Sequence, residues 1–386
     1  MSRRTRIRVL VPEELLTERP AGALFGYHHP STGTFNVVSW GEAPAHRPGV
    51  IEGLGRLVTD TEDAGPGDGL LGRFVDDRLE LTYGGEACQV EAYRLTSDVF
   101  SRNSGILETD RMLDRGAVLC GCGSVGSLVA LELARAGVGR FLLIDQDVFS
   151  YVNVCRHQCG ISDVGRTKVE ALRERILDIH PGARVACETR PIENLEREVF
   201  DRWCDRETVV VGCADNRQAD LYANRIACLY EAPFVSIGLW ERAFAGEVFW
   251  CVPGEGPCYN CVFGAQAQVL SNRPSVNRRI YTTEERSEAA SFEPGIAADI
   301  GWVTLVGVKL ILDLLSREDR EHRPRVLAAL EPFTLLCNTT DGRSGGELAE
   351  IFDHPLQITR SITVDRDPDC EHCAFVGVEL ARLGGP

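Results

Sequence analysis

The sequence predicts an α/β protein in which a Rossmann-like domain with a mostly parallel sheet follows a small α+β domain. From about residue 101 to residue 251, short apolar runs alternate with helical segments, a pattern typical of a parallel sheet with helices on both faces. A glycine-rich motif directly follows the first of these runs, as at the phosphate-binding turn of such domains. The N-terminal part instead carries isolated β-like runs broken by Gly, Pro and Asp. We therefore expect an N-terminal domain at residues 1–95 and a second domain at residues 96–386.

In the N-terminal domain, three short runs have the composition of strands, at residues 7–11, 35–40 and 79–83. The stretch at residues 27–31 reads Tyr-His-His-Pro-Ser and places two histidines side by side. No acidic residue stands at a recognisable ligand spacing from them, so a loop or turn is a better interpretation than a metal site. The role of this domain stays open.

In the second domain, strands and helices are expected to alternate along the chain. Apolar runs predict buried strands at residues 117–120, 141–144, 208–211 and 234–237. Helical periodicity joins these runs at residues 127–136, 168–179 and 220–230. Strands that alternate with helices in this way form one parallel sheet.

The C-terminal part is less regular. Residues 264–298 are polar and weakly patterned, as expected of a segment that crosses over the domain. Residues 300–315 show strong helical periodicity. After a Gly- and Ser-rich break at residues 341–346, residues 358–364 predict a last strand.

Composition excludes several classes of protein. The net charge of −16 over 386 residues argues against broad attraction to nucleic acid or anionic membranes. Every hydrophobic run is interrupted before the roughly 18 residues that a spanning helix needs. The basic N-terminus lacks the apolar stretch of a signal peptide. Fifteen cysteines without an export signal indicate thiols, some of them committed to metal, in a cytoplasmic protein.

Residues 121–126 read Gly-Cys-Gly-Ser-Val-Gly between the first strand and the first helix of the second domain. Gly121 permits a tight turn, Gly123 lets backbone amides approach a phosphate, and Gly126 lets helix and strand pack closely. The helix N-terminus adds partial positive charge. Asp145, at the end of the second strand, is placed to accept hydrogen bonds from ribose hydroxyls. The motif therefore predicts a nucleotide site.

The glycine pattern alone favours NAD, and the residues that follow it favour ATP. Hydride transfer needs no group that neutralises a triphosphate. A carboxylate that attacks the α-phosphate of ATP, in contrast, must approach a polyanion and displace pyrophosphate. Arg156 and Lys168 offer positive charge for that chemistry, although each taken singly is typical of a solvated helix surface. Asp147 or Asp215 offers the carboxylate oxygens that Mg²⁺ prefers.

Six motifs follow one another in the chain: Phe100-Ser101-Arg102-Asn103, the glycine loop, Asp145-Gln146-Asp147, Asn153-Val154-Cys155-Arg156-His157, Gly165-Arg166-Thr167-Lys168 and Cys213-Ala214-Asp215-Asn216. In this order they resemble the motifs of the ThiF/MoeB-type, E1-like adenylating enzymes, which activate the C-terminal carboxylate of ubiquitin-like proteins. The resemblance covers about residues 100–375. His157 stands where the family has glutamine.

The resemblance implies a role for each motif. It implies catalytic roles for Arg102, Arg156, Lys168 and Asp215, the last as the magnesium ligand. It implies nucleotide binding by Gly121, Gly123, Gly126, Asp145, Asp147 and Asn153. In this family the counterpart of Arg102 reaches the ATP phosphates of the partner subunit. A homodimer, or a heterodimer with a related chain, is therefore expected.

Two Cys-x-x-Cys pairs, Cys258 with Cys261 and Cys370 with Cys373, lie far apart in the sequence. Four thiolates satisfy tetrahedral Zn²⁺ with no open position, so the pairs predict a structural zinc site that staples the C-terminal segment to the adenylation domain. In E1-like enzymes such pairs bind zinc. A redox role is less consistent, because neither pair follows a βα turn in the thioredoxin manner.

The crossing segment at residues 264–298 contains no cysteine, although E1 enzymes that form a thioester usually carry the catalytic cysteine there. At the place where a Ser-Cys often stands before a glycine, this chain has Ser291 and Phe292. Cys155 and Cys159 lie near the expected phosphate site, and they would be reactive only if exposed beside Arg156 and His157. The sequence therefore supports adenylation and leaves thioester formation open.

The function favoured by these motifs is ATP-dependent adenylation of the C-terminus of a ubiquitin-like protein. The acyl-adenylate would pass to an E2-like protein, an amine or a sulfur carrier. Activation of a carboxylate on a short peptide is an alternative, since the N-terminal domain is suited to holding either substrate. An inactive subunit that supports an active partner, and an NAD-dependent oxidoreductase, are further alternatives.

Overall fold

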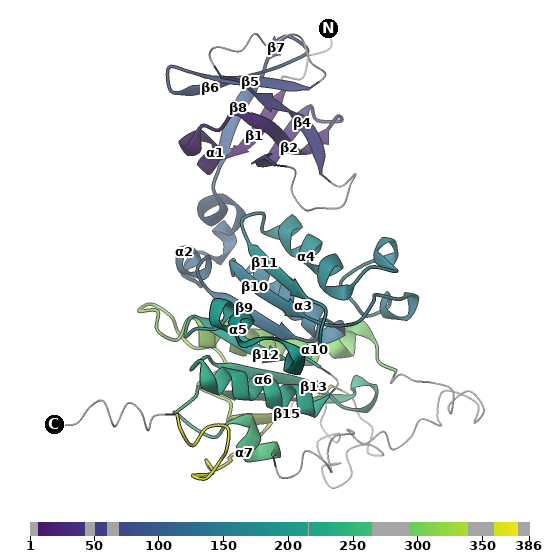
Figure 1. Cartoon of the computed structure of the whole chain (residues 1–386), viewed down its shortest axis with the longest axis vertical. Helices are drawn as coiled ribbons and strands as arrows, with labels where there is room; N and C mark the ends of the chain where they lie inside the picture. Colours follow the sequence, from purple (N-terminus) through teal and green to yellow (C-terminus); the bar gives the residue numbers. More distant parts are fainter. Residues whose placement is uncertain are drawn as a thin grey trace, which may run out of the picture. The chain divides into compact units, whose positions relative to one another are not determined.

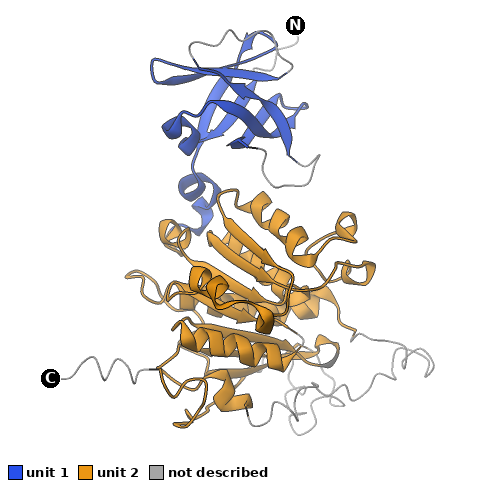
Figure 2. Cartoon of the chain, viewed as in Figure 1, with its two compact units in different colours: residues 1–104 blue, residues 105–386 orange. Residues whose placement is uncertain are grey.

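The computed structural model describes residues 7–42, 51–59, 69–214, 216–264, 294–338 and 359–376. The chain divides into two compact units, residues 1–104 and 105–386 (Figure 2). The division falls after Ser104, whereas the sequence pattern predicts a boundary near residue 95. Most of the crossing segment, including Ser291 and Phe292, lies outside the described residues, and so does Asp215.

In its described residues, unit 1 is an eight-stranded mixed sheet with one short α-helix, α1 (Glu13–Glu18). Its strands are β1 (Arg8–Pro12), β2 (Gly22–His29), β3 (Thr34–Gly41), β4 (Glu52–Leu57), β5 (Leu70–Val75), β6 (Arg78–Tyr83), β7 (Glu86–Ala87) and β8 (Gln89–Tyr93). They lie in the order β7-β6-β5-β4-β2-β3-β1-β8. Two short turns of helix, η1 (Leu95–Val99) and η2 (Ser101–Asn103), follow β8. The three expected strands are present as β1, β3 and β6.

The two adjacent histidines are not in a loop. Tyr27, His28 and His29 end strand β2, and the turn begins only at Pro30. The His28 ring stacks on Phe35 of β3, with ring centroids 4.1 Å apart. The loop interpretation was therefore wrong for these three residues, because a flat imidazole beside a phenyl ring makes a favourable cross-strand pair.

Unit 2 contains a second eight-stranded sheet, in the order β11-β10-β9-β12-β13-β14-β15-β16 (Figure 1). Its strands are β9 (Gly116–Cys120), β10 (Arg140–Ile144), β11 (Arg184–Glu188), β12 (Thr208–Gly212), β13 (Phe234–Leu239), β14 (Ala245–Cys251), β15 (Phe333–Cys337) and β16 (Thr359–Ile362). The first five in that order are parallel, and β14, β15 and β16 extend the sheet antiparallel. This confirms the predicted Rossmann-like, mostly parallel architecture.

The helices of unit 2 cover both faces of the sheet. They are α2 (Thr109–Met112), α3 (Ser124–Arg135), α4 (Lys168–Ile179), α5 (Arg197–Trp203), α6 (Arg217–Leu229), α7 (Tyr259–Phe263) and α10 (Ala297–Leu315). In β9, Ala117 and Leu119 belong to the core that includes α3 and α10, whereas Val118 and Cys120 belong to the core that includes α5 and α6. Burial on both faces explains why this strand is apolar throughout.

The helices expected at residues 127–136, 168–179, 220–230 and 300–315 are present as α3, α4, α6 and α10. Strand β11 was not expected, because its sequence, Arg-Val-Ala-Cys-Glu, is short and begins and ends with a charged residue. In the structure this strand is only partly buried. None of the helices in the described residues combines the length and the apolar character needed to cross a bilayer.

His180, which directly follows α4, makes the fold sensitive to acid. Burial lowers the pKa of its imidazole to about 4, although a hydrogen bond to the backbone of Gly137 acts in the opposite direction. The unfolded chain therefore binds the proton first, so the stability contributed by neutral His180 is full above about pH 6.5 and is lost as the pH falls toward 4. Urea titrations at pH 7 and pH 5 give the drop in the free energy of unfolding between these two pH values. We expect this drop to be about 1–2 kcal/mol smaller in the His180→Gln variant than in the parent. Parallel pH profiles for the two proteins would contradict this.

Candidate functional site

A cavity of about 250 Å³ lies at the carboxyl ends of β9, β10 and β12. Its lining comes from the glycine loop after β9, from residues 144–147 around the end of β10, from Lys168, and from Cys213, Ala214 and Asn216 after β12. This is the position at which open parallel sheets bind nucleotides. The glycine loop and the acids that the sequence predicts as nucleotide ligands therefore share one cavity.

The glycine loop needs glycine for steric reasons at two positions. Gly121 has φ +99°, and a Cβ there would lie 2.8 Å from backbone atoms of Cys213. At Gly126 a Cβ would lie 2.0 Å from the carbonyl oxygen of Gly121, so any side chain would separate helix α3 from the strand. A Cβ at Gly123, the residue before α3, would meet no described atom within 4 Å. Gly121 and Gly126 are therefore needed for the shape of the loop, whereas Gly123 leaves the open side of the loop free of side-chain atoms.

This difference separates two alanine variants. We expect Gly126→Ala to lower the free energy of unfolding by about 2–3 kcal/mol, because the added methyl overlaps backbone that cannot move freely. Gly123→Ala is expected to change stability by less than about 0.5 kcal/mol while weakening ATP binding about tenfold, because its methyl occupies the approach to the amides. Urea titration and calorimetric titration with ATP measure the two effects. Equal stability of the two variants would refute this account of the loop.

Asp145 fixes the loop and faces the cavity. Its Oδ2 accepts a hydrogen bond from the backbone N–H of Cys122 (2.7 Å), and its Oδ1 accepts one from Asp147 (2.8 Å). The side chain is only 10% exposed. A carboxylate has about four acceptor sites, so Asp145 retains capacity for hydroxyl donors in the cavity. The geometry is consistent with its predicted role as a ribose ligand.

Lys168 is one of two cationic residues, with Arg190, among the described residues that line this cavity. Its Nζ lies 2.6 Å from Oδ2 of Asp147 and 3.9 Å from Oδ1 of Asp145. The Lys168 side chain is 11% exposed, whereas that of Asp147 is 59% exposed. The backbone N–H of Lys168 also donates to the Asp147 carbonyl oxygen at 3.0 Å. The start of α4 is thereby held against the end of β10, with the ammonium group inside the cavity.

The motif around residue 153 lies beside the glycine loop but does not line the cavity. The Asn153 side-chain oxygen accepts hydrogen bonds from the backbone N–H (2.9 Å) and the hydroxyl (3.0 Å) of Ser150, which caps a short turn. Arg156 is half-buried, and neither it nor Asn153 is among the cavity-lining residues. Their predicted roles with ATP therefore stay predictions.

His157 joins this motif to the glycine loop. Its Nδ1 accepts a hydrogen bond from the backbone N–H of Cys159 (3.0 Å), so its Nε2 carries the proton and donates to the carbonyl oxygen of Cys122 at 2.8 Å. Burial lowers the pKa of His157, which keeps the ring neutral. A glutamine amide offers the same pair of one donor and one acceptor, so histidine can replace it here.

Besides Arg156, two further residues with predicted catalytic roles keep those roles as predictions. Arg102 lies in η2 of unit 1 with an exposed side chain, and its action on ATP stays a prediction. Asp215 lies outside the described residues, although its neighbours Ala214 and Asn216 line the cavity.

Sequence reasoning missed one wall of the cavity. Residues 190–193, which follow β11, also line it. Arg190 is held there by both carboxylate oxygens of Glu196, at 2.8 Å each, and by Glu188 at 3.2 Å. The missing signal was β11 itself: once that strand is placed beside β10, the segment after it must lie near Asp145.

Only Cys155 is exposed among the fifteen cysteines, all of which are described. Cys120 and Cys228 are buried in the core, as expected. Cys159 is 3% exposed, and burial raises the pKa of its thiol to about 12. The condition for reactivity at Cys159, exposure, is therefore not met.

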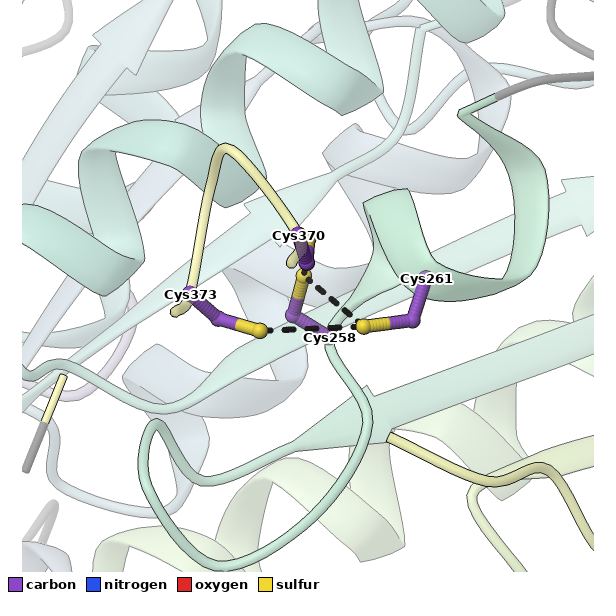
Figure 3. Close-up of side chains that lie close together, drawn as sticks. All are labelled: Cys258, Cys261, Cys370 and Cys373. Atoms are coloured by element: carbon purple, nitrogen blue, oxygen red, sulfur yellow. Dashed lines mark hydrogen bonds between the residues drawn. The ribbon is translucent and has the colours of Figure 1, made fainter. Parts of the chain in front are cut away.

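The two Cys-x-x-Cys pairs come together, as Figure 3 shows. Cys258 and Cys261 lie at the start of α7, and Cys370 and Cys373 lie in a turn after β16. The sulfur atoms of Cys258 and Cys261 are 3.8 Å apart. Between the pairs, the sulfur of Cys258 lies 3.6 Å from that of Cys370, and the sulfur of Cys261 lies 3.6 Å from that of Cys373. Four sulfurs at 2.3 Å from a tetrahedral zinc ion would be about 3.8 Å apart. The cluster therefore fits zinc, and within the described part of the chain no other group of three or more His, Cys, Asp or Glu converges in this way.

Comparison with known proteins connects this geometry to a family. A sequence profile described as the ThiF family matches residues 99–339. Ubiquitin-like modifier-activating enzyme 5 of Caenorhabditis elegans is 28% identical over 166 residues, which are 40% of this chain and 39% of that protein. The protein of the same name from Oryza sativa subsp. japonica is 30% identical over 168 residues, 41% of this chain and 40% of its own. The chain thus spans about two fifths of the length of these relatives.

Among solved structures, the microcin C7 biosynthetic enzyme MccB in complex with N-formylated MccA is similar, with a TM-score of 0.51 and 19% identity. The match covers 72% of this chain and 75% of that one. At this level of identity the likeness shows a shared fold.

Proposed function

Because the chain belongs to the ThiF family, we propose that it is an ATP-dependent, E1-like adenylyltransferase that activates the C-terminal carboxylate of a ubiquitin-like protein. One observation carries this proposal: one cavity is lined by a glycine loop at a helix N-terminus, by two carboxylates and by a lysine whose side chain is only 11% exposed. The relatives described as ubiquitin-like modifier-activating enzymes favour a protein substrate. A nicotinamide cofactor would make no use of Lys168 beside Asp147.

The proposed reaction forms one bond and breaks another. A carboxylate oxygen of the substrate attacks the α-phosphorus of ATP, and the bond from that phosphorus to the bridging oxygen breaks. Pyrophosphate leaves with the electron pair, and acyl-AMP remains. The amides of the glycine loop and the partial positive charge at the α3 N-terminus stabilise the phosphates. Lys168 exchanges its exposed partner Asp147 for phosphate oxygens, which are stronger acceptors of a charged donor.

Two metals accompany this proposal. Asp147 and Asp215 are the residues we assign to Mg²⁺, which neutralises phosphate charge when bound. Cys258, Cys261, Cys370 and Cys373 are assigned to structural Zn²⁺. The zinc site complements the pairing of β16 with β15, which also attaches the C-terminal segment to the sheet.

Arg102 requires a partner subunit in this proposal. We infer a homodimer in which Arg102 of each chain reaches the ATP of the other, and an E2-like or sulfur-carrier protein that accepts the acyl group. The fifteen cysteines, none of them in a disulfide, suit a reducing cytoplasm. A dimer in light scattering supports this arrangement. So does loss of exchange activity in the Arg102→Ala variant, if activity is recovered when this variant is mixed with Lys168→Met subunits.

ATP–pyrophosphate exchange tests the proposed function. Purified full-length chain is assayed with ATP, magnesium and either small ubiquitin-like proteins or short peptides that carry free C-termini. Exchange stimulated only by a ubiquitin-like protein supports the proposal. Exchange that requires a short peptide assigns peptide tailoring instead. Neither exchange nor ATP binding with any carboxylate would identify an inactive supporting subunit.

A further inference from the structure

Helix α6 runs from the nucleotide cavity to the four-cysteine cluster. Asn216 and Ala219, at its start, line the cavity, and the Asn216 side chain caps the helix by accepting from the N–H of Gln218 at 2.9 Å. Arg217 and Asn224 are about two helical turns apart and therefore lie on one face. Both side chains are buried. A single helix thus presents two buried polar groups to whatever packs on that face.

Arg217 contacts the first cysteine pair through the residues beside it. Its Nη1 donates to the Tyr259 hydroxyl at 3.1 Å, and its guanidinium lies 4.4 Å from the centre of the Phe263 ring. Tyr259 stands between Cys258 and Cys261. Arg217 also forms a salt bridge with Glu247 of β14, in which Nη2 and Oε1 are 2.8 Å apart. Both side chains are less than a tenth exposed.

Asn224 contacts both cysteine pairs. Its Oδ1 accepts a hydrogen bond from the backbone N–H of Tyr259 at 3.0 Å. Its Nδ2 lies 3.2 Å from Nδ1 of His372, which stands between Cys370 and Cys373. A metal ion in the cluster would join the segment around Tyr259 to the segment around His372. These same two segments contact α6, at Arg217 and at Asn224.

We propose that Arg217 and Asn224 are positioning residues that couple the metal cluster to the nucleotide cavity, so that zinc binding raises the affinity for ATP. The inference rests on the proposed nucleotide site. Zinc fixes the relative positions of Tyr259, Phe263 and His372, and these residues fix the register of α6. Without zinc the contacts of Arg217 and Asn224 loosen, and the start of α6, with Ala214 and Asn216, becomes less ordered. ATP must then restore that order when it binds, which weakens its apparent affinity.

The sharpest test is Tyr259→Phe, which keeps all four cysteines and the aromatic ring but removes the hydroxyl that Arg217 contacts. Tyr222→Phe, on α6 itself and outside the contacts described above, is the matched control. We expect both variants to retain one zinc per chain by plasma mass spectrometry. The Kd for ATP, by calorimetric titration, should rise about fivefold in Tyr259→Phe and stay within twofold of the parent in Tyr222→Phe.

Removal of zinc tests the same coupling from the other side. We expect stripped parent protein to bind ATP at least tenfold more weakly than zinc-loaded protein. The double variant Arg217→Met/Glu247→Gln removes the buried charges together, because Arg217→Met alone would leave Glu247 buried without its cation. In this variant the ratio of stripped to loaded Kd should fall to within about threefold.

Hydrogen exchange without nucleotide separates this inference from the proposed function. On zinc removal, amides in the first two turns of α6 should exchange at least fivefold faster, whereas those of α3 should not change. An unchanged ATP Kd in Tyr259→Phe together with unchanged α6 exchange on stripping would overturn the coupling while leaving the ATP site intact. If the zinc-loaded parent protein bound no ATP, the proposed function would fail. The change in hydrogen exchange of α6 on zinc removal would then decide by itself whether the metal cluster orders the start of α6.

Discussion

Replacement of Lys168 by methionine is expected to lower kcat/KM for ATP–pyrophosphate exchange by about 10²–10³-fold, the usual loss when one preorganised charged donor is removed from a catalytic site. The Lys168 ammonium lies inside the cavity and is 2.6 Å from an exposed carboxylate that phosphate can replace. Methionine keeps the unbranched aliphatic shape of the lysine stem and removes only its charged end. The ion pair with Asp147, which is 59% exposed, contributes about 0–1 kcal/mol to stability. Activity should therefore fall far more than stability.

The sequence contains an unusually clean control, because it has only two lysines. Lys309 lies on α10 with an exposed side chain, and Lys309→Met should leave the exchange rate within about twofold of the parent. An ATP analogue that acylates nearby amines should label Lys168 and spare Lys309, and excess ATP should block the labelling. Equal losses of activity in the two variants, or ATP-insensitive labelling of Lys168, would refute its assignment to the phosphates.

Replacement of Cys370 by serine is expected to lower bound zinc from about one ion per chain to near zero. Metal binding to a preformed four-thiolate site contributes directly to folding free energy. We expect a loss on the order of 5 kcal/mol, which corresponds to about 10–20 °C in Tm for a unit of this size. Mass spectrometry of metal content and differential scanning calorimetry measure the two effects.

Cys155→Ser controls for the loss of a thiol. Cys155 is the exposed cysteine, and its variant should keep both zinc and Tm within about 1 °C of the parent. Cys370→Ser protein that retained a full zinc ion and its Tm would show that the cluster is not a metal site. If Cys155→Ser kept adenylation but lost transfer to an acceptor, Cys155 would have the thioester role that the sequence leaves open.

Several features could be predicted from sequence because they depend on residues near one another in the chain. The helix at residues 168–179 was predicted with the bounds that the structure has. The glycine spacing at residues 121–126 defined a turn whose steric contacts were then found at Gly121 and Gly126. These are local properties, because they follow from periodicity and backbone geometry over a few residues.

Other features could not be predicted because they depend on the order of strands. Residues 190–193 line the cavity because β11 lies beside β10, and no local pattern in that segment indicates a ligand. The pairing of Lys168 with Asp147, and the use of Asn153 as a turn cap, likewise follow from how separate segments meet. The family resemblance implies a catalytic role for Lys168 and nucleotide binding for Asn153, and of these two residues only Lys168 lines the cavity.

The amino-acid sequence by itself determined that this protein has a Rossmann-like domain with a glycine loop after its first strand, and a set of four cysteines suited to zinc. Glycine positions, apolar periodicity and ligand spacing are readable without knowing what lies across the sheet. Only the tertiary structure decided that the two cysteine pairs converge, and that α6 joins their cluster to the cavity through Arg217 and Asn224. Such contacts connect residues far apart in the chain, and their geometry is set by the packing of whole helices and strands.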